Sequence, residues 1–275
     1  MITLNHNHKL HSAKNLAAYP HFVDQQQRED LSIFDHILWV QHPVTKIWWP
    51  WLVTEGEHSF LERIDQGLTT LTANERTRAI EMGILIDDIT LLEQCVEFNT
   101  RLITCRSLIR TAGYCVIPSI VFPTYYFTVN YYVNTIDQTL VLDGQVDRRR
   151  SKHNAALFRS VHSQLAALIQ SIVDEPLKPS YCFMSVYPTS SELKRHTDRP
   201  QCRWNASVTF ARTDSIWPIH VETSDGVDHE VMADIGEIVV YRGTDLPHWR
   251  TPLPKGTATV CFFHFVDQAF QGSLI

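Results

Sequence analysis

Two histidines and a carboxylate are the residues of this sequence whose types and spacing could do chemistry. His196 and Asp198 are separated by Thr197 alone, and His248 follows a later apolar run at 238–241. In an extended strand the side chains alternate between faces, so His196 and Asp198 would point the same way. Two imidazoles and one carboxylate on one octahedral face leave three positions open, which suits iron(II) and dioxygen. The sequence therefore predicts a mononuclear iron site held by His196, Asp198 and His248.

The segments around these residues resemble a known family in order and spacing. Tyr187 precedes His196 by nine residues, an apolar segment at 203–210 follows Asp198, and a glycine turn with an apolar strand at 234–241 precedes His248. From about 180 to 266 the chain resembles the iron(II)/2-oxoglutarate-dependent oxygenase superfamily, particularly its prolyl-4-hydroxylase-like branch. The resemblance implies a double-stranded β-helix, a cupin-like jelly roll, with Fe(II) as cofactor and 2-oxoglutarate as cosubstrate.

The resemblance also implies a reaction. Such enzymes use dioxygen to hydroxylate a C–H bond, here of an amino acid, a peptide or protein side chain, or a natural-product intermediate. Halogenases of the superfamily lack the carboxylate that Asp198 supplies, so hydroxylation is favoured over halogenation. Nothing in the sequence identifies the substrate further.

One position departs from the family pattern. The family usually has Lys or Arg about ten residues after the distal histidine, and here that position is Ala258. A buried carboxylate without a cationic partner is costly, so another residue must bind the far end of 2-oxoglutarate. Arg250 is the leading candidate, because two residues past His248 its side chain should share the same face. The other candidates are Arg203 and Arg212 on the strand after Asp198, Lys255 in a turn, and Tyr187 as a cosubstrate-binding partner.

Aromatic residues and further histidines surround the predicted site in sequence. Trp204, Trp217 and Trp249 could shape the substrate pocket, although large aromatic side chains more often pack in a core. The same core interpretation is favoured for the tryptophans at 48–51. We expect His264 to be packed beside the site. We expect exposure for the two histidines of a hairpin with an Asp225-Gly226 turn, His220 and His229.

Local patterns predict a mainly helical first part and a β-rich second part. Thr72 and Glu75 form a capping-box pattern that starts a helix ending near Gly83. Apolar spacing predicts longer helices over about 91–113 and 153–173. Residues 1–30 read as a polar, weakly ordered lead-in, and β-branched and aromatic composition predicts strands within 114–133. Short strands are predicted at 181–187, 206–210, 219–222, 238–241 and 257–266.

These elements define an α+β fold class. We expect a mainly helical region with some strands at 1–175, packed on a double-stranded β-helix core at 176–275. The alternatives from the residues themselves are a cupin-like iron oxygenase that does not use 2-oxoglutarate, and a non-catalytic interaction module that retains the fold. A nucleic-acid demethylase of the same superfamily would use the same three ligands.

Composition argues against a nucleic-acid or a membrane partner. The 24 Lys and Arg against 30 Asp and Glu give a net charge of −6, and only the run at 147–152 is locally basic, which is typical of a solvated loop. No nucleic acid and no membrane is therefore expected, the partners being dioxygen and a small-molecule or peptide substrate. The six scattered cysteines and the polar N-terminus predict a reduced, cytoplasmic protein.

Overall fold

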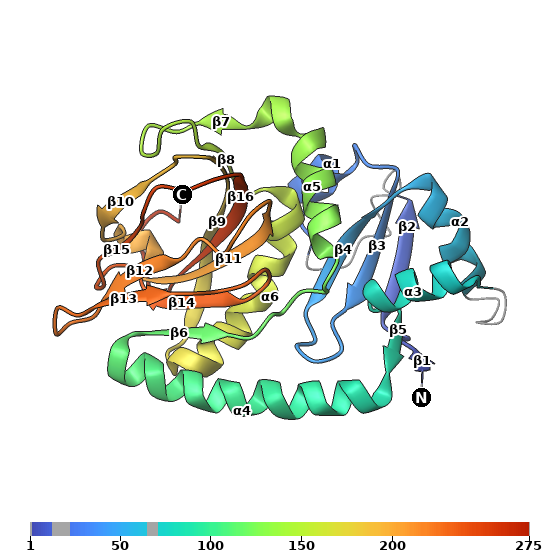
Figure 1. Ribbon diagram of the computed structural model, residues 1–275, viewed down its shortest axis with the longest axis horizontal. Helices are drawn as coiled ribbons and strands as arrows, with labels where there is room; N and C mark the ends of the chain where they lie inside the picture. Colours follow the sequence, from blue (N-terminus) through green and yellow to red (C-terminus); the bar gives the residue numbers. More distant parts are fainter. Residues whose placement is uncertain (1, 13–22, 65–70, 275) are drawn as a thin grey trace. The chain divides into compact units, whose positions relative to one another are not determined.

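The chain divides into two units in the computed structural model, which describes residues 2–12, 23–64 and 71–274 (Figure 1). Unit 1 comprises Met1–Glu97 and Ile120–Thr135, and unit 2 comprises Phe98–Ser119 and Ile136–Ile275. The long helix α4, Asp88–Ala112, contributes residues to both. In the described part of the chain, no helix is long and apolar enough to cross a membrane.

Unit 1 is built on a three-stranded antiparallel sheet in the order β2-β3-β4. Three tryptophans of β3 and β4 are fully buried, Trp39, Trp49 and Trp51, and the Tyr125 hydroxyl donates a hydrogen bond to the Pro50 carbonyl at 3.0 Å. The tryptophans therefore pack in a core, as the sequence predicts for 48–51, apart from the half-buried Trp48. The elements of unit 1 besides the start of α4 are β1 (Ile2–Leu4), β2 (His8–Ser12), α1 (Gln25–Leu31), β3 (His36–Gln41), β4 (Trp48–Val53), α2 (Glu55–Ile64), α3 (Ala73–Glu81), β5 (Leu85–Asp87) and α5 (Tyr125–Thr135).

Unit 2 contains two antiparallel sheets, one in the order β6-β14-β11-β16-β9-β8-β7 and the other in the order β10-β15-β12-β13. Its strands are β6 (Tyr114–Ile117), β7 (Val141–Leu142), β8 (Arg150–His153), β9 (Leu177–Pro188), β10 (Leu193–His196), β11 (Trp204–Arg212), β12 (Ile219–Glu222), β13 (Asp228–Val231), β14 (Ile238–Arg242), β15 (His248–Arg250) and β16 (Thr257–Asp267). Its helical elements, besides the end of α4, are η3 (Asp137–Thr139), α6 (Ala156–Val173) and η4 (Pro200–Cys202).

The two sheets of unit 2 pack face to face. One apolar cluster joins Tyr187 of β9 and Phe262 of β16 to Leu193 of β10, and a second joins Val221 of β12 to Tyr241 of β14. Helix α6 packs against the larger sheet (Figure 1) through aromatic contacts of Phe158 and His162 with residues of β11 and β16. Side chains of the two sheets thus share one core.

Several sequence predictions are confirmed. Thr72 and Glu75 form the predicted capping box at the start of α3, and Gly113 ends α4 with a φ of 77° that glycine adopts without strain. Helix α6 occupies most of 153–173. All five predicted strands between 181 and 266 are present as β9, β11, β12, β14 and β16.

Two predictions of secondary structure are wrong. Only Tyr114–Ile117 of the segment 114–133 is a strand, and Tyr125–Thr135 is a helix. The buried residues Tyr125, Val129, Tyr132 and Val133 recur with helical spacing, so packing of one face overrides the β propensity of their types. The predicted weakly ordered lead-in contains β1, β2 and α1, since distant strands pair with β1 and β2. Its residues 13–22 lie outside the described part of the chain.

Candidate metal centre

The three predicted metal ligands come together at one edge of the smaller sheet of unit 2. Strand β10 ends at His196 and β15 begins at His248, and these two residues are direct antiparallel partners. Asp198 lies in the loop after β10. His196 Nε2 is 3.7 Å from Asp198 Oδ1, and His248 Nε2 is 3.8 Å from Asp198 Oδ2. The two imidazole centroids are 4.4 Å apart.

Both imidazoles present the same nitrogen to this centre. His196 Nδ1 contacts the Lys194 carbonyl at 2.7 Å, and His248 Nδ1 contacts the Leu246 carbonyl at 2.9 Å. Because a carbonyl oxygen only accepts hydrogen bonds, Nδ1 must carry the proton in each ring. The Nε2 lone pairs are then free to bind a metal, with ring orientation fixed by the backbone.

Burial also keeps the second ligand in its metal-binding form. The side chain of His248 is 2% exposed, and burial lowers its pKa below the usual value. Asp198 acts in the opposite direction and raises that pKa, while His196 lowers it. The net lowering favours a neutral imidazole near pH 7, which is the form that coordinates metals.

The carboxylate is held by the backbone and by a neighbouring amide. Asp198 N–H donates to the Gly243 carbonyl at 2.8 Å, and Asn205 Nδ2 donates to Asp198 Oδ2 at 3.3 Å. A Cβ added to Gly243 would lie 2.3 Å from Asp198 Oδ2 and 2.5 Å from the Cys202 carbonyl. Glycine is therefore required at 243 by close approach. Sequence analysis identified neither Asn205 nor Gly243 as a site residue, since both act through contacts between separate segments.

The donor set fits an octahedral divalent ion. The three ligand atoms lie within 4.8 Å of one another. Adjacent ligands of an octahedral ion with bonds of about 2.1 Å are about 3 Å apart, so the donors need to close by less than about 2 Å around an ion. Two neutral imidazoles and one carboxylate on one side of the ion would leave the other positions open to small ligands.

A second group of possible donors shares Asp198 with Cys202 and His264. Burial raises the pKa of the Cys202 thiol to about 11, so this sulfur is protonated at neutral pH and is a poor ligand. His264 is fully buried, packed against the Tyr181 ring with centroids 4.5 Å apart, as expected for a histidine beside the site. The group of His196, Asp198 and His248 is therefore the better metal centre.

The centre opens into a cavity of about 410 Å³. This volume lies in the range typical of small-molecule sites. Besides the ligands, the lining includes Tyr181, Phe183 and Arg199, and Asp143, Gln145 and Arg149 of the loop before β8. The site can thus hold one small molecule, or one side chain of a larger molecule, beside the metal ligands.

Arg250, two residues past His248 on β15, has no acidic partner among the described residues. Arg250 is 3% exposed, donates from Nη1 to the Trp217 carbonyl, and lies with its guanidinium carbon 4.9 Å from the centroid of the Trp217 ring. Its Nε has no hydrogen-bond partner, and no carboxylate of the described residues lies within ion-pair distance of it. Burial lowers its pKa, while Tyr187 and Tyr241 nearby raise it, and a guanidinium stays charged at neutral pH in any case.

Tyr241 adds a second unsatisfied group to this region. Its hydroxyl is buried without a partner, and its ring lies 4.6 Å from that of His248. Burial and the nearby Asp198 carboxylate raise its pKa well above the usual value, so the hydroxyl remains a hydrogen-bond donor. Buried polar groups are normally paired, so Arg250 and Tyr241 both have hydrogen-bond donors left for an acceptor. Sequence analysis missed this role of Tyr241.

The other predicted cosubstrate residues have different surroundings. Tyr187 is fully buried, and its hydroxyl accepts a hydrogen bond of 2.9 Å from Arg149 Nη1. Arg203 is exposed and paired with Glu175 at 2.9 Å. Arg149 pairs with Asp143 and its side chain is 4% exposed, so the prediction of a solvated loop at 147–152 is wrong for this residue. It is buried because it packs against the rings of β9.

None of the three tryptophans singled out by sequence lines the cavity. Trp204 is buried against Arg242, Trp217 is buried beside Arg250, and Trp249 is half-buried and stacked on His220. The prediction that His220 and His229 are exposed is wrong, because both are half-buried and His220 contacts Asp228 at 3.2 Å.

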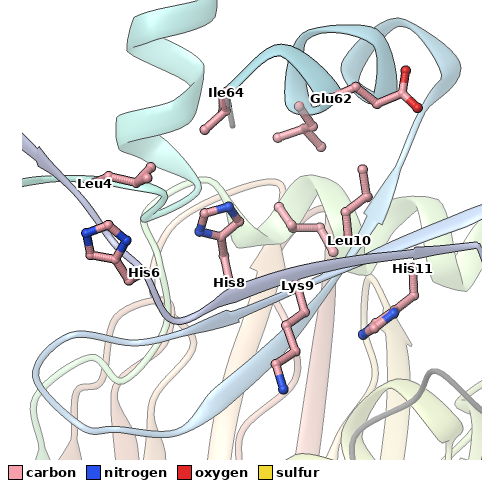
Figure 2. Close-up of a pocket in the computed structure, with 10 residues that line it drawn as sticks. Leu4, His6, His8, Lys9, Leu10, His11, Glu62 and Ile64 are labelled. Atoms are coloured by element: carbon pink, nitrogen blue, oxygen red, sulfur yellow. The ribbon is translucent and has the colours of Figure 1, made fainter. Parts of the chain in front are cut away.

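Unit 1 has a larger hollow, of about 790 Å³, lined by His6, His8 and His11 together with leucines and Glu62. Figure 2 shows that His8 and Leu10 extend from β2 toward α2, whereas Lys9 and His11 extend to the opposite side of the strand. Among the described residues, these histidines form no group that could hold a metal. This hollow is therefore not a second candidate centre.

Comparison with known proteins supports the fold over about three fifths of the chain. No protein-family model matches the sequence, and no curated protein matches it either. A Pseudomonas putida prolyl-4-hydroxylase structure is 17% identical over 59% of this chain and 98% of its own, with a TM-score of 0.50. A Trichoplax adhaerens prolyl hydroxylase, in complex with a hypoxia-inducible-factor peptide fragment, is 12% identical over 62% of this chain and 92% of its own, with a TM-score of 0.51.

A third solved structure, HygX from Streptomyces hygroscopicus with nickel and 2-oxoglutarate bound, is 14% identical over 60% of this chain and 86% of its own, with a TM-score of 0.50. The chain therefore shares the fold of iron(II)/2-oxoglutarate oxygenases. At these identities the likeness concerns the fold alone.

Proposed function

We propose that this protein is an iron(II)- and 2-oxoglutarate-dependent dioxygenase that hydroxylates a C–H bond of an amino acid, a peptide or protein side chain, or a natural-product intermediate. The observation that carries the proposal is the convergence of His196, Asp198 and His248 from separate segments on one small volume. Open positions beside such a ligand set suit an ion that must bind a cosubstrate and dioxygen together.

We further propose that β9 to β16 form a double-stranded β-helix. Successive strands change sheet except at the β12–β13 hairpin, with β9, β11, β14 and β16 in one sheet and β10, β12, β13 and β15 in the other. This alternation supports a core whose strands wind between two facing sheets. It also explains how residues at 196–198 and 248 can meet, since β10 and β15 are neighbours.

Arg250 would bind the far carboxylate of 2-oxoglutarate. Its buried guanidinium, which has no acidic partner among the described residues, lies on the strand that starts with His248. The far carboxylate of the cosubstrate would accept a hydrogen bond from its free Nε. The usual basic position, Ala258, is buried in the apolar cluster with Tyr187 and Trp217. The cation would therefore come from β15 and not from position 258.

Tyr241 and Tyr187 would complete the cosubstrate site. The Tyr241 hydroxyl has no hydrogen-bond partner and Tyr241 belongs to the cavity lining, so this hydroxyl can donate to a carboxylate oxygen of a ligand there. Tyr187 would contribute its hydroxyl oxygen, which already accepts a hydrogen bond from Arg149. Arg203 is the weaker candidate, since it is exposed and already paired with Glu175.

The residues of this chain would ligate, orient and exclude water, while the bound iron and 2-oxoglutarate supply the oxidising power for attack on a C–H bond. His196 and His248 keep their Nε2 atoms directed at the ion through backbone hydrogen bonds. Asn205 holds Asp198. His248 and Tyr241 are both buried, which would limit the access of water to the ligands on their side of the cavity.

The proposal is tested by anaerobic calorimetry followed by an oxygen-dependent assay. Tag-free protein loaded with iron(II) should bind 2-oxoglutarate and release succinate in air, faster when a substrate from pooled amino acids, peptides or metabolites is present. The substrate should gain one oxygen atom by mass spectrometry. Iron uptake without 2-oxoglutarate binding would favour a cupin-like oxygenase, and no uptake of any divalent ion would favour a non-catalytic module.

A further inference from the structure

Arg199 is a cation on the wall of the cavity, one residue beyond a metal ligand. Its Nη2 donates to the Tyr181 hydroxyl at 2.8 Å and its Nε does so at 3.3 Å. The guanidinium carbon also lies 5.2 Å from the centroid of the Tyr181 ring. Tyr181 therefore holds one edge of the guanidinium, and the other edge is directed away from this contact.

The arginine lacks the acidic partner that its neighbours have. Arg149 pairs with Asp143, Arg195 with Glu222, and Arg203 with Glu175. Within the described ranges, no carboxylate lies within 4.0 Å of the Arg199 guanidinium nitrogens, and its contacts are with Tyr181 and Cys202. A cation with free donors at the wall of a small cavity favours an anionic ligand.

The remaining charges of the cavity do not cancel this cation. Asp143, also in the cavity lining, is neutralised by its ion pair with Arg149. Asp198 lies beside the two imidazoles, and the divalent ion of the proposed function would offset its charge. Burial and the proximity of Arg199 lower the pKa of His153, another lining residue, which favours its neutral form at pH 7. Arg199 thus supplies an uncompensated positive charge beside the metal centre.

We propose that Arg199, oriented by Tyr181, binds an anionic oxygen group of the prime substrate, a carboxylate or a phosphate ester, and so selects acids over neutral analogues. This inference rests on the proposed function and specifies its substrate class. The two arginines would have separate tasks: Arg250, buried on β15, would bind the cosubstrate, and Arg199, which belongs to the cavity lining, would bind the substrate.

The substrate need not be known to test this. Protein loaded with Mn(II) and saturated with 2-oxoglutarate without oxygen would be mixed with benzoate, phenyl phosphate or benzamide, and proton relaxation of each probe would be measured. Mn(II) speeds relaxation of probes bound beside it. We expect at least one of the two anions to show enhancement at least fivefold above that of benzamide, and the stronger anion identifies the group.

Matched variants separate a binding role from a structural one. Arg199→Gln should remove the difference between the anions and benzamide, while Arg199→Lys keeps part of it. Arg195→Gln, which changes an exposed arginine paired with Glu222, should behave as the unmodified protein. Each variant is checked for Mn(II) content and 2-oxoglutarate affinity, which should stay unchanged.

Equal relaxation of the anions and benzamide, in protein that retains Mn(II) and 2-oxoglutarate, would overturn the role of Arg199 and leave the proposed function standing. An unchanged difference in Arg199→Gln would do the same. Failure of the unmodified protein to retain Mn(II) or 2-oxoglutarate would instead overturn the proposed function, and the inference with it.

Discussion

The two cavities of this molecule contain similar residue types and differ in what they can do. The hollow of unit 1 is lined by three histidines and a glutamate, and the lining of the cavity of unit 2 includes the two candidate ligand histidines and an aspartate. In unit 1 the strand β2 sends His8 and His11 to opposite sides (Figure 2). In unit 2, β10 and β15 place His196 opposite His248.

The difference shows that a count of ligand-type residues does not make a site. His8 Nδ1 contacts the Asn5 carbonyl at 2.5 Å, a backbone contact like that of His248, yet His8 belongs to no group of three possible metal ligands in the described part of unit 1. Convergence needs two strands that end at the same edge, a nearby carboxylate, and fixed ring orientations. Of the two cavities, as far as the structure describes them, the one in unit 2 combines these features.

The largest difference between the two cavities is expected when their histidine and carboxylate side chains are removed. His196→Ala, Asp198→Ala or His248→Ala should each abolish retention of iron(II), because two donors leave the ion largely hydrated and weakly held. His8→Ala in unit 1 should leave metal content unchanged. Elemental analysis of tag-free protein measures both, and metal loss in the His8 variant would contradict the assignment.

A second prediction tests whether Arg250, the buried arginine of β15 in unit 2, binds 2-oxoglutarate. Arg250→Met should weaken 2-oxoglutarate binding about 100-fold, about 2.7 kcal/mol, because a charge-assisted contact with a buried carboxylate is lost. Iron(II) affinity should change little. Arg203→Met, which removes an exposed arginine paired with Glu175, is the matched control. Anaerobic calorimetry gives both affinities, and equal effects of the two substitutions would exclude Arg250 as the anchor.

The smallest expected effect concerns two glycines, one in each unit. Gly243→Ala should weaken iron(II) binding about tenfold, since the new Cβ would displace the Asp198 carboxylate. Gly56→Ala in α2 meets nothing within 4 Å and should change the free energy of unfolding by less than about 1 kcal/mol. Metal titration and thermal unfolding measure these effects. Unimpaired metal binding in the Gly243 variant would show that the close approach is not required.

Local patterns in the sequence predicted much of the fold. Capping at Thr72, the apolar spacing of α4 and α6, and the β-rich segments after 180 depend on neighbours within a few residues. The errors arose where distant partners decide. Helix α5 is built from Tyr, Phe and Val that favour strands locally, and β1 and β2 are strands because β5 and β3 pair with them.

The sequence by itself determined the three candidate ligands and the missing basic residue at 258, because strand alternation and spacing are properties of the chain. The tertiary structure alone decided which arginines are unpaired. Arg203 pairs with Glu175 from a distant segment and Arg149 pairs with Asp143 of its own loop, whereas no carboxylate of the described residues pairs with Arg250 or Arg199. Whether a cation can serve a ligand depends on the charges that folding brings within a few ångströms, and no local pattern encodes that distance.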